Sequence, residues 1–212
     1  MKDIAIFGAG GFGREVACLI HSININTQTW NLIGFFDDNT DLKGTKNEYG
    51  EVIGGIDALN HHEKDLAIVI AIGNPSTMKK VVSKIRNERV YFPTIIAPDV
   101  IMMDDKNLSI GCGNIICSKC WLSCNLSIGD FNIFNVGSII GHDVVIGNYN
   151  SMMPSVNISG EVVIGDENFF GVASVVLQQK KIGNNTVIGG NSLIIKNTKD
   201  GRTYMGNPAM AL

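Results

Sequence analysis

The sequence lacks the features that mark several large classes of protein. Its 17 basic and 20 acidic residues give a formal net charge of -3, which provides no electrostatic footprint for nucleic acid. No apolar run approaches the ~20 residues that a membrane span needs. The chain passes from Met1 straight into an expected strand, so no signal peptide is expected. Proline is scarce, with five residues, unlike in low-complexity disorder. We therefore expect a folded protein whose partners are neither nucleic acid nor membrane.

Cysteine is present in an odd number, five, and four of the five lie between Cys112 and Cys124. An odd number without a secretory context does not suggest a disulfide framework. The sequence therefore predicts a reduced, cytoplasmic protein.

Glycine, by contrast, is abundant, and Ile-Gly pairs recur at intervals of 18 residues. Dividing this interval by three gives a period of six, at which every position from 110 to 194 is apolar. These positions are Ile110, Ile116, Leu122, Ile128, Phe134, Ile140, Ile146, Met152, Ile158, Ile164, Phe170, Val176, Ile182, Ile188 and Ile194. A period of six fits neither an α-helix nor a free strand, but it fits short strands separated by corners. Three such strands close one coil, so we predict a parallel β-helix of about five coils over roughly residues 95–198.

Two further predictions concern the interior and the corners of this β-helix. The residue two positions before each inward residue is mostly small or branched, as a narrow interior requires. Examples are Ser138, Val144, Asn150, Val156, Val162, Ser174, Thr186 and Ser192. Glycine and asparagine fall near the corners, where we expect positive φ angles.

The register argues against two kinds of metal site. The spacing of Cys112, Cys117 and Cys120 matches a plant-type iron–sulfur pattern, and Cys124 would complete a tetrathiolate zinc site. In the six-residue register, however, Cys120 faces inward and the other three fall at different phases, so the sulfurs are not expected to converge. Zinc-dependent hydration, which uses three histidines on such a β-helix, fails because His21, His61 and His62 all lie before the repeat. We expect no metal.

Residues 1–93 show a different pattern, in which short apolar strands alternate with helices, and we assign them to a separate α/β domain of Rossmann type. Residues 94–212 form the second domain. The first strand is followed by Gly8-Ala9-Gly10-Gly11-Phe12-Gly13, which matches G-x-G-x-x-G before a helix. Such a turn offers free N–H groups to an anion, most often a phosphate. Asp37 and Asp38 end the second strand, where ribose hydroxyls are commonly held.

This loop leaves alternatives open. The glycines could serve only to make a tight turn. A dinucleotide reading would make the protein an NAD(P)-dependent oxidoreductase, but the domain is only about half the size of the six-stranded sheet that holds both nucleotides of NAD. A single nucleotide, or a small molecule linked to one, fits the space better.

The order of these motifs along the whole chain resembles the bacterial sugar acetyltransferases that act on UDP-linked 4-amino sugars, and their sialic acid O-acetyltransferase relatives. The motifs are the glycine-rich loop, Phe36-Asp37-Asp38, Ala71-Ile72-Gly73-Asn74, Gly141-His142-Asp143 and Gly206-Asn207-Pro208-Ala209. The resemblance implies that the β-helix is left-handed, that it binds acetyl-CoA, that the first domain binds a nucleotide-sugar, and that three chains assemble into a homotrimer.

The resemblance also implies roles for single residues. His142 matches the general base of the family, and Asp143 matches the acidic residue thought to raise its basicity. The nucleotide-sugar would contact Gly10, Gly11, Phe12, Asp37, Asp38 and Gly73. Acetyl-CoA would contact Val172, Gly190 and Ser151, the last of which replaces a histidine that the family often carries near the thioester.

The chemistry of His142 suits this role independently. Acetyl transfer from a thioester requires an amine or hydroxyl to lose a proton, and an imidazole with a pKa near 6.5 accepts one at neutral pH. Its place two residues after Ile140 should direct it out of the coil. Neighbouring residues of a strand point in opposite directions, so Asp143 would reach His142 only at a corner or across a subunit boundary.

We therefore predict an acetyl-CoA-dependent N-acetyltransferase acting on a nucleotide-linked amino sugar by direct transfer. The alternative within the same chemistry is O-acetylation of sialic acid or of another small hydroxyl acceptor such as serine. The alternatives from other classes are an NAD(P)-binding oxidoreductase and a non-catalytic module.

Overall fold

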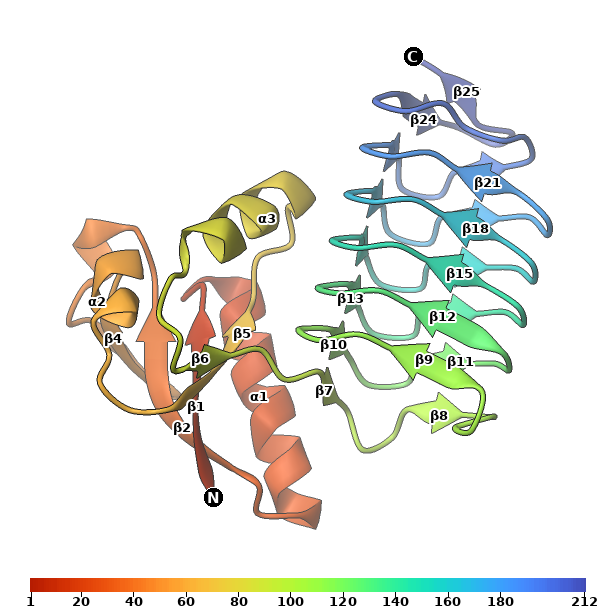
Figure 1. Ribbon diagram of the computed structural model, residues 1–212. Coiled ribbons are helices and arrows are strands. Elements are labelled where there is room, and N and C mark those ends of the chain that lie inside the picture. The colour runs from red at the N-terminus through yellow and green to blue at the C-terminus, as the bar shows by residue number, and fades with distance from the viewer. The chain divides into compact units, whose positions relative to one another are not determined.

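The computed structural model describes residues 1–212, which divide into two compact units, Met1–Pro98 and Asp99–Leu212 (Figure 1). None of the helices combines the length and the apolar character that a membrane span requires.

The first unit is a Rossmann-like α/β fold. Its sheet has the order β3-β4-β2-β1-β5-β6 and is parallel except for the β3–β4 hairpin. The strands are β1 (Lys2–Phe7), β2 (Trp30–Phe36), β3 (Lys46–Asn47), β4 (Gly50–Gly54), β5 (Leu66–Ile70) and β6 (Val90–Tyr91). The helices are α1 (Gly11–Asn26), the 3-10 turn η1 (Thr40–Leu42), α2 (Ile56–Asn60) and α3 (Pro75–Lys84). The sheet has six strands, more than its short sequence suggested, but β3 and β6 contribute only two residues each.

The core of this unit is the middle of the sheet. All five residues of β5 are buried, which explains why its sequence is a continuous apolar run with no alternation. Helix α1 buries Val16, Leu19 and Ile20, which recur at helical spacing. Because β1, β2 and β5 are parallel neighbours, the residues that follow them meet at one edge of the sheet.

The second unit is a left-handed parallel β-helix with three flat faces, and its short strands stack coil upon coil in Figure 1. β7 (Ile95–Ile96) precedes it. The first face carries β10 (Ile115–Ile116), β13 (Ile133–Phe134), β16 (Ser151–Met152), β19 (Phe169–Phe170) and β22 (Val187–Ile188), followed by β24 (Thr203–Met205) and β25 (Met210–Ala211). The second carries β8 (Ile101–Met102), β11 (Trp121–Leu122), β14 (Ile139–Ile140), β17 (Asn157–Ile158), β20 (Val175–Val176) and β23 (Leu193–Ile194). The third carries β9 (Leu108–Ile110), β12 (Leu126–Ile128), β15 (Val145–Ile146), β18 (Val163–Ile164) and β21 (Lys181–Ile182).

The six-residue period is confirmed as the inward column. Ile140 pairs with Leu122 in the preceding coil and with Ile158 in the next, a step of 18 residues each way. Of the predicted inward residues only Ile110, in the first coil, is half-buried, and all the others are buried. The small residues two positions earlier are buried as well, as the narrow interior required.

A column of amides runs through the interior beside the aliphatic column. Asn114, Asn132, Asn150 and Asn168 are fully buried at steps of 18 residues. The side-chain oxygen of Asn132 accepts from the backbone N–H of Asn150 at 2.9 Å and from its amide group at 3.0 Å. Each buried amide thus satisfies backbone groups of the next coil, which removes the penalty of burying them unpaired.

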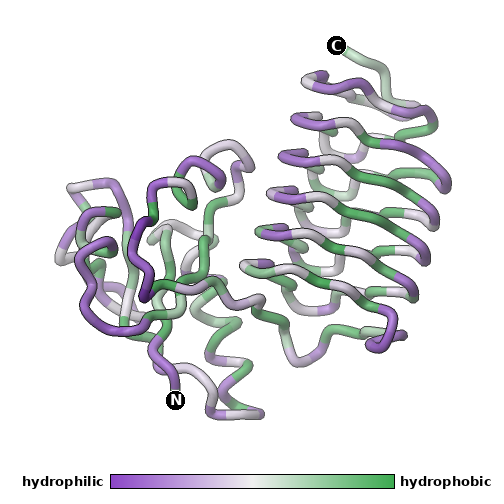
Figure 2. Tube along the Cα trace, in the orientation of Figure 1, coloured by the Kyte–Doolittle hydropathy of each residue, from purple (hydrophilic) through white to green (hydrophobic).

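The corners correct one prediction. Positive φ angles do recur every sixth residue, and Asn125, Asn185 and Asn191 are among the residues that adopt them, but nine others are neither glycine nor asparagine. The glycine of the Ile-Gly pairs is needed for a different reason, which is close approach between coils. A Cβ on Gly129 would lie 2.6 Å from the carbonyl oxygen of Gly147 in the next coil. Figure 2 shows the resulting alternation of hydrophobic strands and hydrophilic corners along the coils.

Candidate active site

His142 lies at the corner between β14 and β15, two residues after inward-facing Ile140. Its side chain is 47% exposed, so the prediction that it points out of the coil is confirmed. The preceding Gly141 allows the next coil to approach closely here, since a Cβ would lie 2.6 Å from the backbone nitrogen of Gly160.

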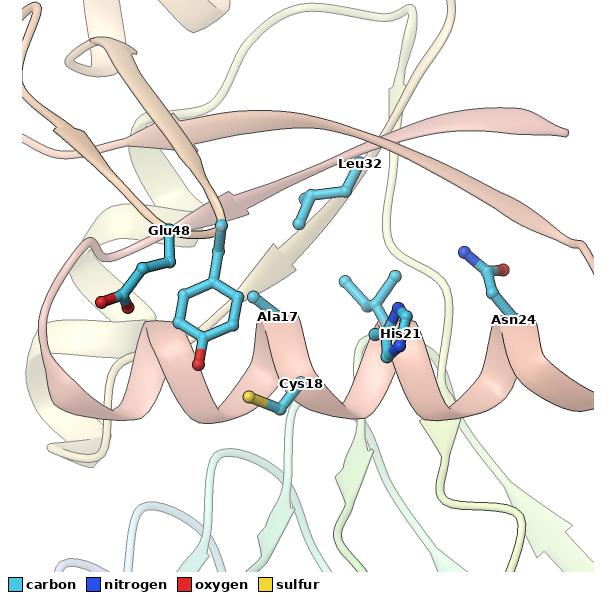
Figure 3. A pocket seen from close by; sticks show the side chains of 8 residues that line it. Ala17, Cys18, His21, Asn24, Leu32 and Glu48 are labelled. Carbon is cyan, nitrogen blue, oxygen red and sulfur yellow. The ribbon is translucent and has the colours of Figure 1, made fainter.

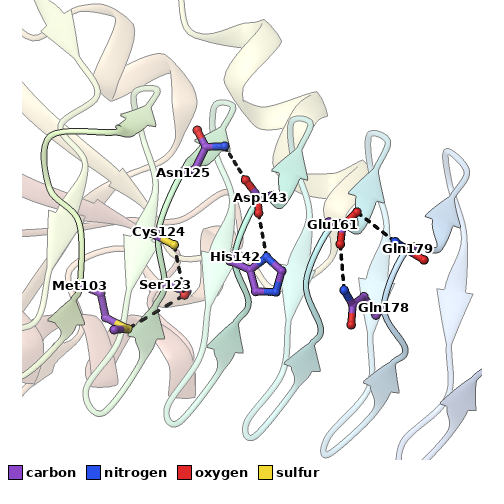
Figure 4. Close-up of polar contacts among 9 residues, drawn as sticks. All are labelled: Met103, Ser123, Cys124, Asn125, His142, Asp143, Glu161, Gln178 and Gln179. Atoms are coloured by element: carbon purple, nitrogen blue, oxygen red, sulfur yellow. Dashed lines mark hydrogen bonds and ion pairs between the residues drawn. The ribbon is translucent and has the colours of Figure 1, made fainter.

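The imidazole contacts the next residue of its own chain. The Nδ1 atom of His142 lies 2.7 Å from Oδ2 of Asp143 (Figure 4). This contact exists because Asp143 has a φ of 58°, a left-handed conformation that brings two consecutive side chains to the same side. An ionised carboxylate only accepts hydrogen bonds, so Nδ1 carries the proton and Nε2 is left with a free lone pair. The ring is therefore arranged to take a proton at Nε2.

Asp143 is itself supported from the preceding coil. The side-chain amide of Asn125 donates to Oδ1 of Asp143 at 2.5 Å. This hydrogen bond, followed by the one from His142, lowers the pKa of the Asp143 carboxyl below its usual value. Asp143 is thus held ionised and oriented, with one oxygen for each partner.

The imidazole ring of His142 packs against Gly160 of the next coil. A Cβ on Gly160 would lie 2.5 Å from Cε1 of His142, and it would overlap with Nε2 as well. The imidazole therefore occupies the space that a side chain at position 160 would fill. Glu161 follows, and its backbone N–H donates to the carbonyl oxygen of His142 at 2.8 Å. The carboxylate of Glu161 accepts from the amides of Gln178 at 2.8 Å and Gln179 at 3.0 Å.

Sequence reasoning missed Asn125, Gly160 and Glu161, although the repeat offered a signal for all three. Each lies 18 residues from His142 or Asp143, and this step is the distance to the neighbouring coil. A pocket of about 410 Å³ lies on the third face beside this cluster, and its lining includes Asn125, Asp143 and Val145.

In the first unit, the residues expected to contact the nucleotide-sugar gather at the carboxyl ends of β1, β2 and β5. Gly10 caps α1 without a side-chain hydrogen bond, and no acidic residue occupies the first turn of the helix. A Cβ on Gly10 would meet nothing within 4 Å, so packing does not require glycine there. The exposed backbone at Gly10 and Gly11 leaves room for an anion against the helix terminus. Phe12 is half-buried, and Gly73 follows β5.

The carboxylates of Asp37 and Asp38 already accept hydrogen bonds from the backbone of the first unit. Oδ2 of Asp37 accepts from the backbone N–H of Ala9 at 2.8 Å and ties the glycine-rich loop to β2. Oδ1 of Asp38 accepts from the backbone N–H of Ile56 at 2.9 Å. Both line a pocket of about 270 Å³ that also includes Lys43 and Asp57.

The residues expected to contact acetyl-CoA lie elsewhere on the β-helix. Val172 is 53% exposed and follows β19, and Gly190 lies beside it one coil later, where a Cβ would be 3.3 Å from the carbonyl oxygen of Val172. Ser151 lies in β16 and is buried, with no hydrogen-bond partner for Oγ. His142 follows a strand of the second face, whereas these residues belong to the first. The structure thus does not bring the residues expected to bind acetyl-CoA and the expected base His142 to one corner within a chain.

The cysteines do not converge. Cys120 is buried, and burial raises the pKa of its thiol to about 11. Cys112 and Cys124 are exposed at corners, and all five cysteines are free. No group of three histidine, cysteine or carboxylate side chains is arranged to hold a metal ion.

A separate pocket of about 390 Å³ lies between α1 and the β3–β4 hairpin (Figure 3). Cys18 and His21 project from the helix, and Glu48 projects from the hairpin. Tyr49, the next residue of the hairpin, also lines the pocket. A hydrogen bond with Cys18 raises the pKa of the Tyr49 hydroxyl. None of the predicted site residues lines this pocket.

Comparisons with known proteins agree with this architecture. Residues 3–85 match the family described as the PglD N-terminal domain. No curated protein sequence matches the chain. Among solved structures, the acetyltransferase domain of PglB from Neisseria gonorrhoeae FA1090 in complex with acetyl coenzyme A is 27% identical, with a TM-score of 0.89 over 100% of this chain and 99% of that chain.

Two further structures are similar over the full length. WeeI from Acinetobacter baumannii AYE is 29% identical, with a TM-score of 0.89 over 100% of both chains. PerB from Caulobacter crescentus, solved with CoA and GDP-perosamine, is 23% identical, with a TM-score of 0.85 over 100% of this chain and 98% of that chain, a level of identity that shows the fold alone.

Proposed function

We propose that this chain, which belongs to the hexapeptide-repeat sugar acetyltransferase family, is an acetyl-CoA-dependent N-acetyltransferase acting on a nucleotide-linked amino sugar. The observation that carries the proposal is the exposed His142 ring, whose Nδ1 is held 2.7 Å from Asp143 while Nε2 stays free. An imidazole with one nitrogen held by a carboxylate and the other free is what a general base requires.

The reaction is a direct transfer. The amine nitrogen of the acceptor attacks the thioester carbonyl carbon of acetyl-CoA and forms the new C–N bond. His142 takes the amine proton at Nε2, and Asp143 stabilises the imidazolium that results. The tetrahedral intermediate then collapses, the C–S bond breaks, and the thiolate of CoA recovers the proton. General-base assistance of this kind is worth ~10²–10⁴-fold in rate.

The first unit would hold the nucleotide part of the acceptor. Gly10, Gly11 and Phe12 offer a helix N-terminus to phosphate, while Asp37, Asp38 and Gly73 line the adjoining strand ends. Asp38 has more acceptor capacity left for the ligand than Asp37 has, because Asp37 accepts from the backbone N–H groups of both Ala9 and Asn39.

A homotrimer is part of the proposal, because it would bring the two halves of the site together. Val172, Gly190 and Ser151 would hold acetyl-CoA, yet they lie on a different face from His142. A neighbouring copy could present them to the base. Apolar side chains suited to such a contact lie exposed on the second face, with Ile101, Trp121 and Ile139 in register in successive coils. A cytoplasmic location, where the five thiols stay reduced, completes the proposal.

Substitution of the base tests the proposal. His142→Ala is expected to lower kcat by at least about two orders of magnitude, while the protein stays folded because the ring is exposed. The assay follows thiol release from acetyl-CoA with a panel of nucleotide-linked amino sugars. His21→Ala, which removes an exposed imidazole from the first unit, serves as the control and should retain full activity. Undiminished turnover by His142→Ala would contradict the assigned mechanism.

The same screen separates the alternatives. Hydroxyl acceptors such as sialic acid and serine need the same base, so they belong in the panel beside the amines. An oxidoreductase would instead bind NADH, and a non-catalytic module would bind neither NADH nor acetyl-CoA. Ligand-induced shifts in Tm with NADH, acetyl-CoA and UDP-sugars distinguish these cases.

A further inference from the structure

Glu161 belongs to the coil that follows His142, and the imidazole of His142 packs against this coil. The ring fills the place of a side chain at Gly160, so Nε2 lies against the coil that carries residues 160 and 161. The backbone N–H of Glu161 also donates to the carbonyl oxygen of His142 at 2.8 Å, which fixes the two corners against each other. An acceptor that gives its proton to Nε2 would therefore arrive beside Glu161.

We propose that Glu161 is an acceptor-binding residue that makes this site select a protonated amine over a hydroxyl. The inference rests on the proposed function, since it names which acceptor the site favours. It assigns to Glu161 the recognition of the charged form of the acceptor, while proton removal remains with His142.

The negative charge of Glu161 is oriented but not neutralised. Its two oxygens accept from the side-chain amides of Gln178 at 2.8 Å and Gln179 at 3.0 Å, and both donors are uncharged. These hydrogen bonds, from Gln179 first and then Gln178, lower the pKa of the Glu161 carboxyl below its usual value. The carboxylate is thus ionised at neutral pH, and neither of its two hydrogen-bond partners is a cation that would compete with an incoming ammonium group. The imidazole of His142 is close enough to contribute to the lowering of the pKa of Glu161.

Two carboxylates therefore lie near the imidazole, because Asp143 faces Nδ1 and Glu161 occupies the equivalent corner of the next coil (Figure 4). Asp143 is committed to His142 and Asn125, which leaves Glu161 for the acceptor. An aliphatic amine is largely an ammonium ion at neutral pH and is attracted to this pair, whereas a hydroxyl is neutral and is not. In the transfer itself, the ammonium first releases one proton to solvent, the neutral amine attacks the acetyl carbon, and Nε2 takes the second proton while the C–S bond breaks.

The test compares binding of two acceptors that differ at one position. The probes are a UDP-linked 4-amino-4,6-dideoxyhexose and the same UDP-sugar with a hydroxyl at carbon 4, titrated calorimetrically in the presence of CoA. The variant is Glu161→Gln, which removes the charge but keeps an oxygen for one of the two amides of Gln178 and Gln179. Glu88→Gln, an exposed carboxylate of the first unit, is the matched control for the change in net charge.

Wild type and Glu88→Gln are expected to bind the amine more tightly than the hydroxyl sugar, and Glu161→Gln should weaken amine binding by about two- to fivefold while leaving the hydroxyl sugar unchanged. The difference should shrink at high salt, since screening acts on an exposed charge. An amine preference that survives in Glu161→Gln, or its absence from the wild type, overturns the inference. Because the readout is binding, a preference for the amine without turnover would count against the proposed function and leave this inference standing.

Discussion

At the scale of single residues, the candidate site depends on a backbone conformation that L-amino acids seldom adopt. Asp143 has a φ of 58°, and this turns its carboxylate back toward the ring of His142. In an ordinary strand the two side chains would point to opposite faces. Asn125, which has a φ of 56° one coil earlier, meets Asp143 from below because it occupies the equivalent corner.

Asn125→Ala is expected to lower kcat by about two- to tenfold, because Asp143 loses the hydrogen bond that orients it. The lost donor should also let the pKa of Asp143 rise toward its ordinary value of 3.8. A carboxyl whose pKa is lowered in the folded state stabilises the protein at pH values above its ordinary pKa. That stability is lost as the pH falls through the lowered pKa. The Asn125→Ala variant should therefore lose the stabilisation by Asp143 at a higher pH than the wild type does. Steady-state kinetics and an NMR titration of the Asp143 carboxyl measure both effects.

Asn185→Ala is the matched control, because Asn185 also adopts a positive φ at an exposed corner but lies far along the chain from His142. Both variants place alanine in a left-handed conformation, so both should lose similar stability. Equal losses of kcat in the two variants would show that Asn125 acts only through the fold.

At the scale of elements, each strand contributes only two or three residues, so the β-helix is held together between coils and not within them. Two internal columns hold successive coils together, one of aliphatic side chains and one of asparagine amides. The aliphatic column supplies burial, and the amide column satisfies the backbone groups that the tight corners would leave unpaired.

Asn150→Ala is expected to lower the free energy of unfolding by about 3 kcal/mol, because it leaves the buried backbone N–H and side-chain amide of Asn168 without their acceptor and takes one of two donors from the oxygen of Asn132. Ser174→Ala is the control, since Ser174 is equally buried and its hydroxyl has no partner to lose. Chemical denaturation gives both values. Similar losses from the two variants would refute the role assigned to the amide column.

At the scale of the whole molecule, the separation of His142 from Val172 within one chain favours an active site completed by a neighbouring copy. The second face offers Ile101, Trp121 and Ile139 for that contact, with exposed fractions of 50%, 39% and 45%. Burying such side chains between copies stabilises an assembly by removing apolar surface from water.

Replacing both Trp121 and Ile139 by glutamate is expected to convert the proposed trimer to monomers, because unpaired charges would be buried at the contact. The monomer should keep its β-helix by circular dichroism and lose turnover. Ser109→Glu, which places the same charge at an exposed position on the third face, should leave the assembly intact. Sedimentation velocity measures the oligomeric state, and an unchanged sedimentation coefficient in the double variant would exclude the second face as the interface.

The sequence by itself determined the β-helix, its inward column and the outward direction of His142. These follow from a strict six-residue period, which leaves one arrangement that buries every apolar position. Its glycine-rich turn and strand pattern also determined the Rossmann-like first unit.

Only the tertiary structure decided which neighbours His142 has. The contact with Asp143 depends on a positive φ that a residue other than glycine adopts, and the roles of Asn125, Gly160 and Glu161 depend on the stacking of coils 18 residues apart. The reason is that periodicity fixes which way a side chain points, whereas the hydrogen bonds it makes depend on the atoms that the next coil places beside it.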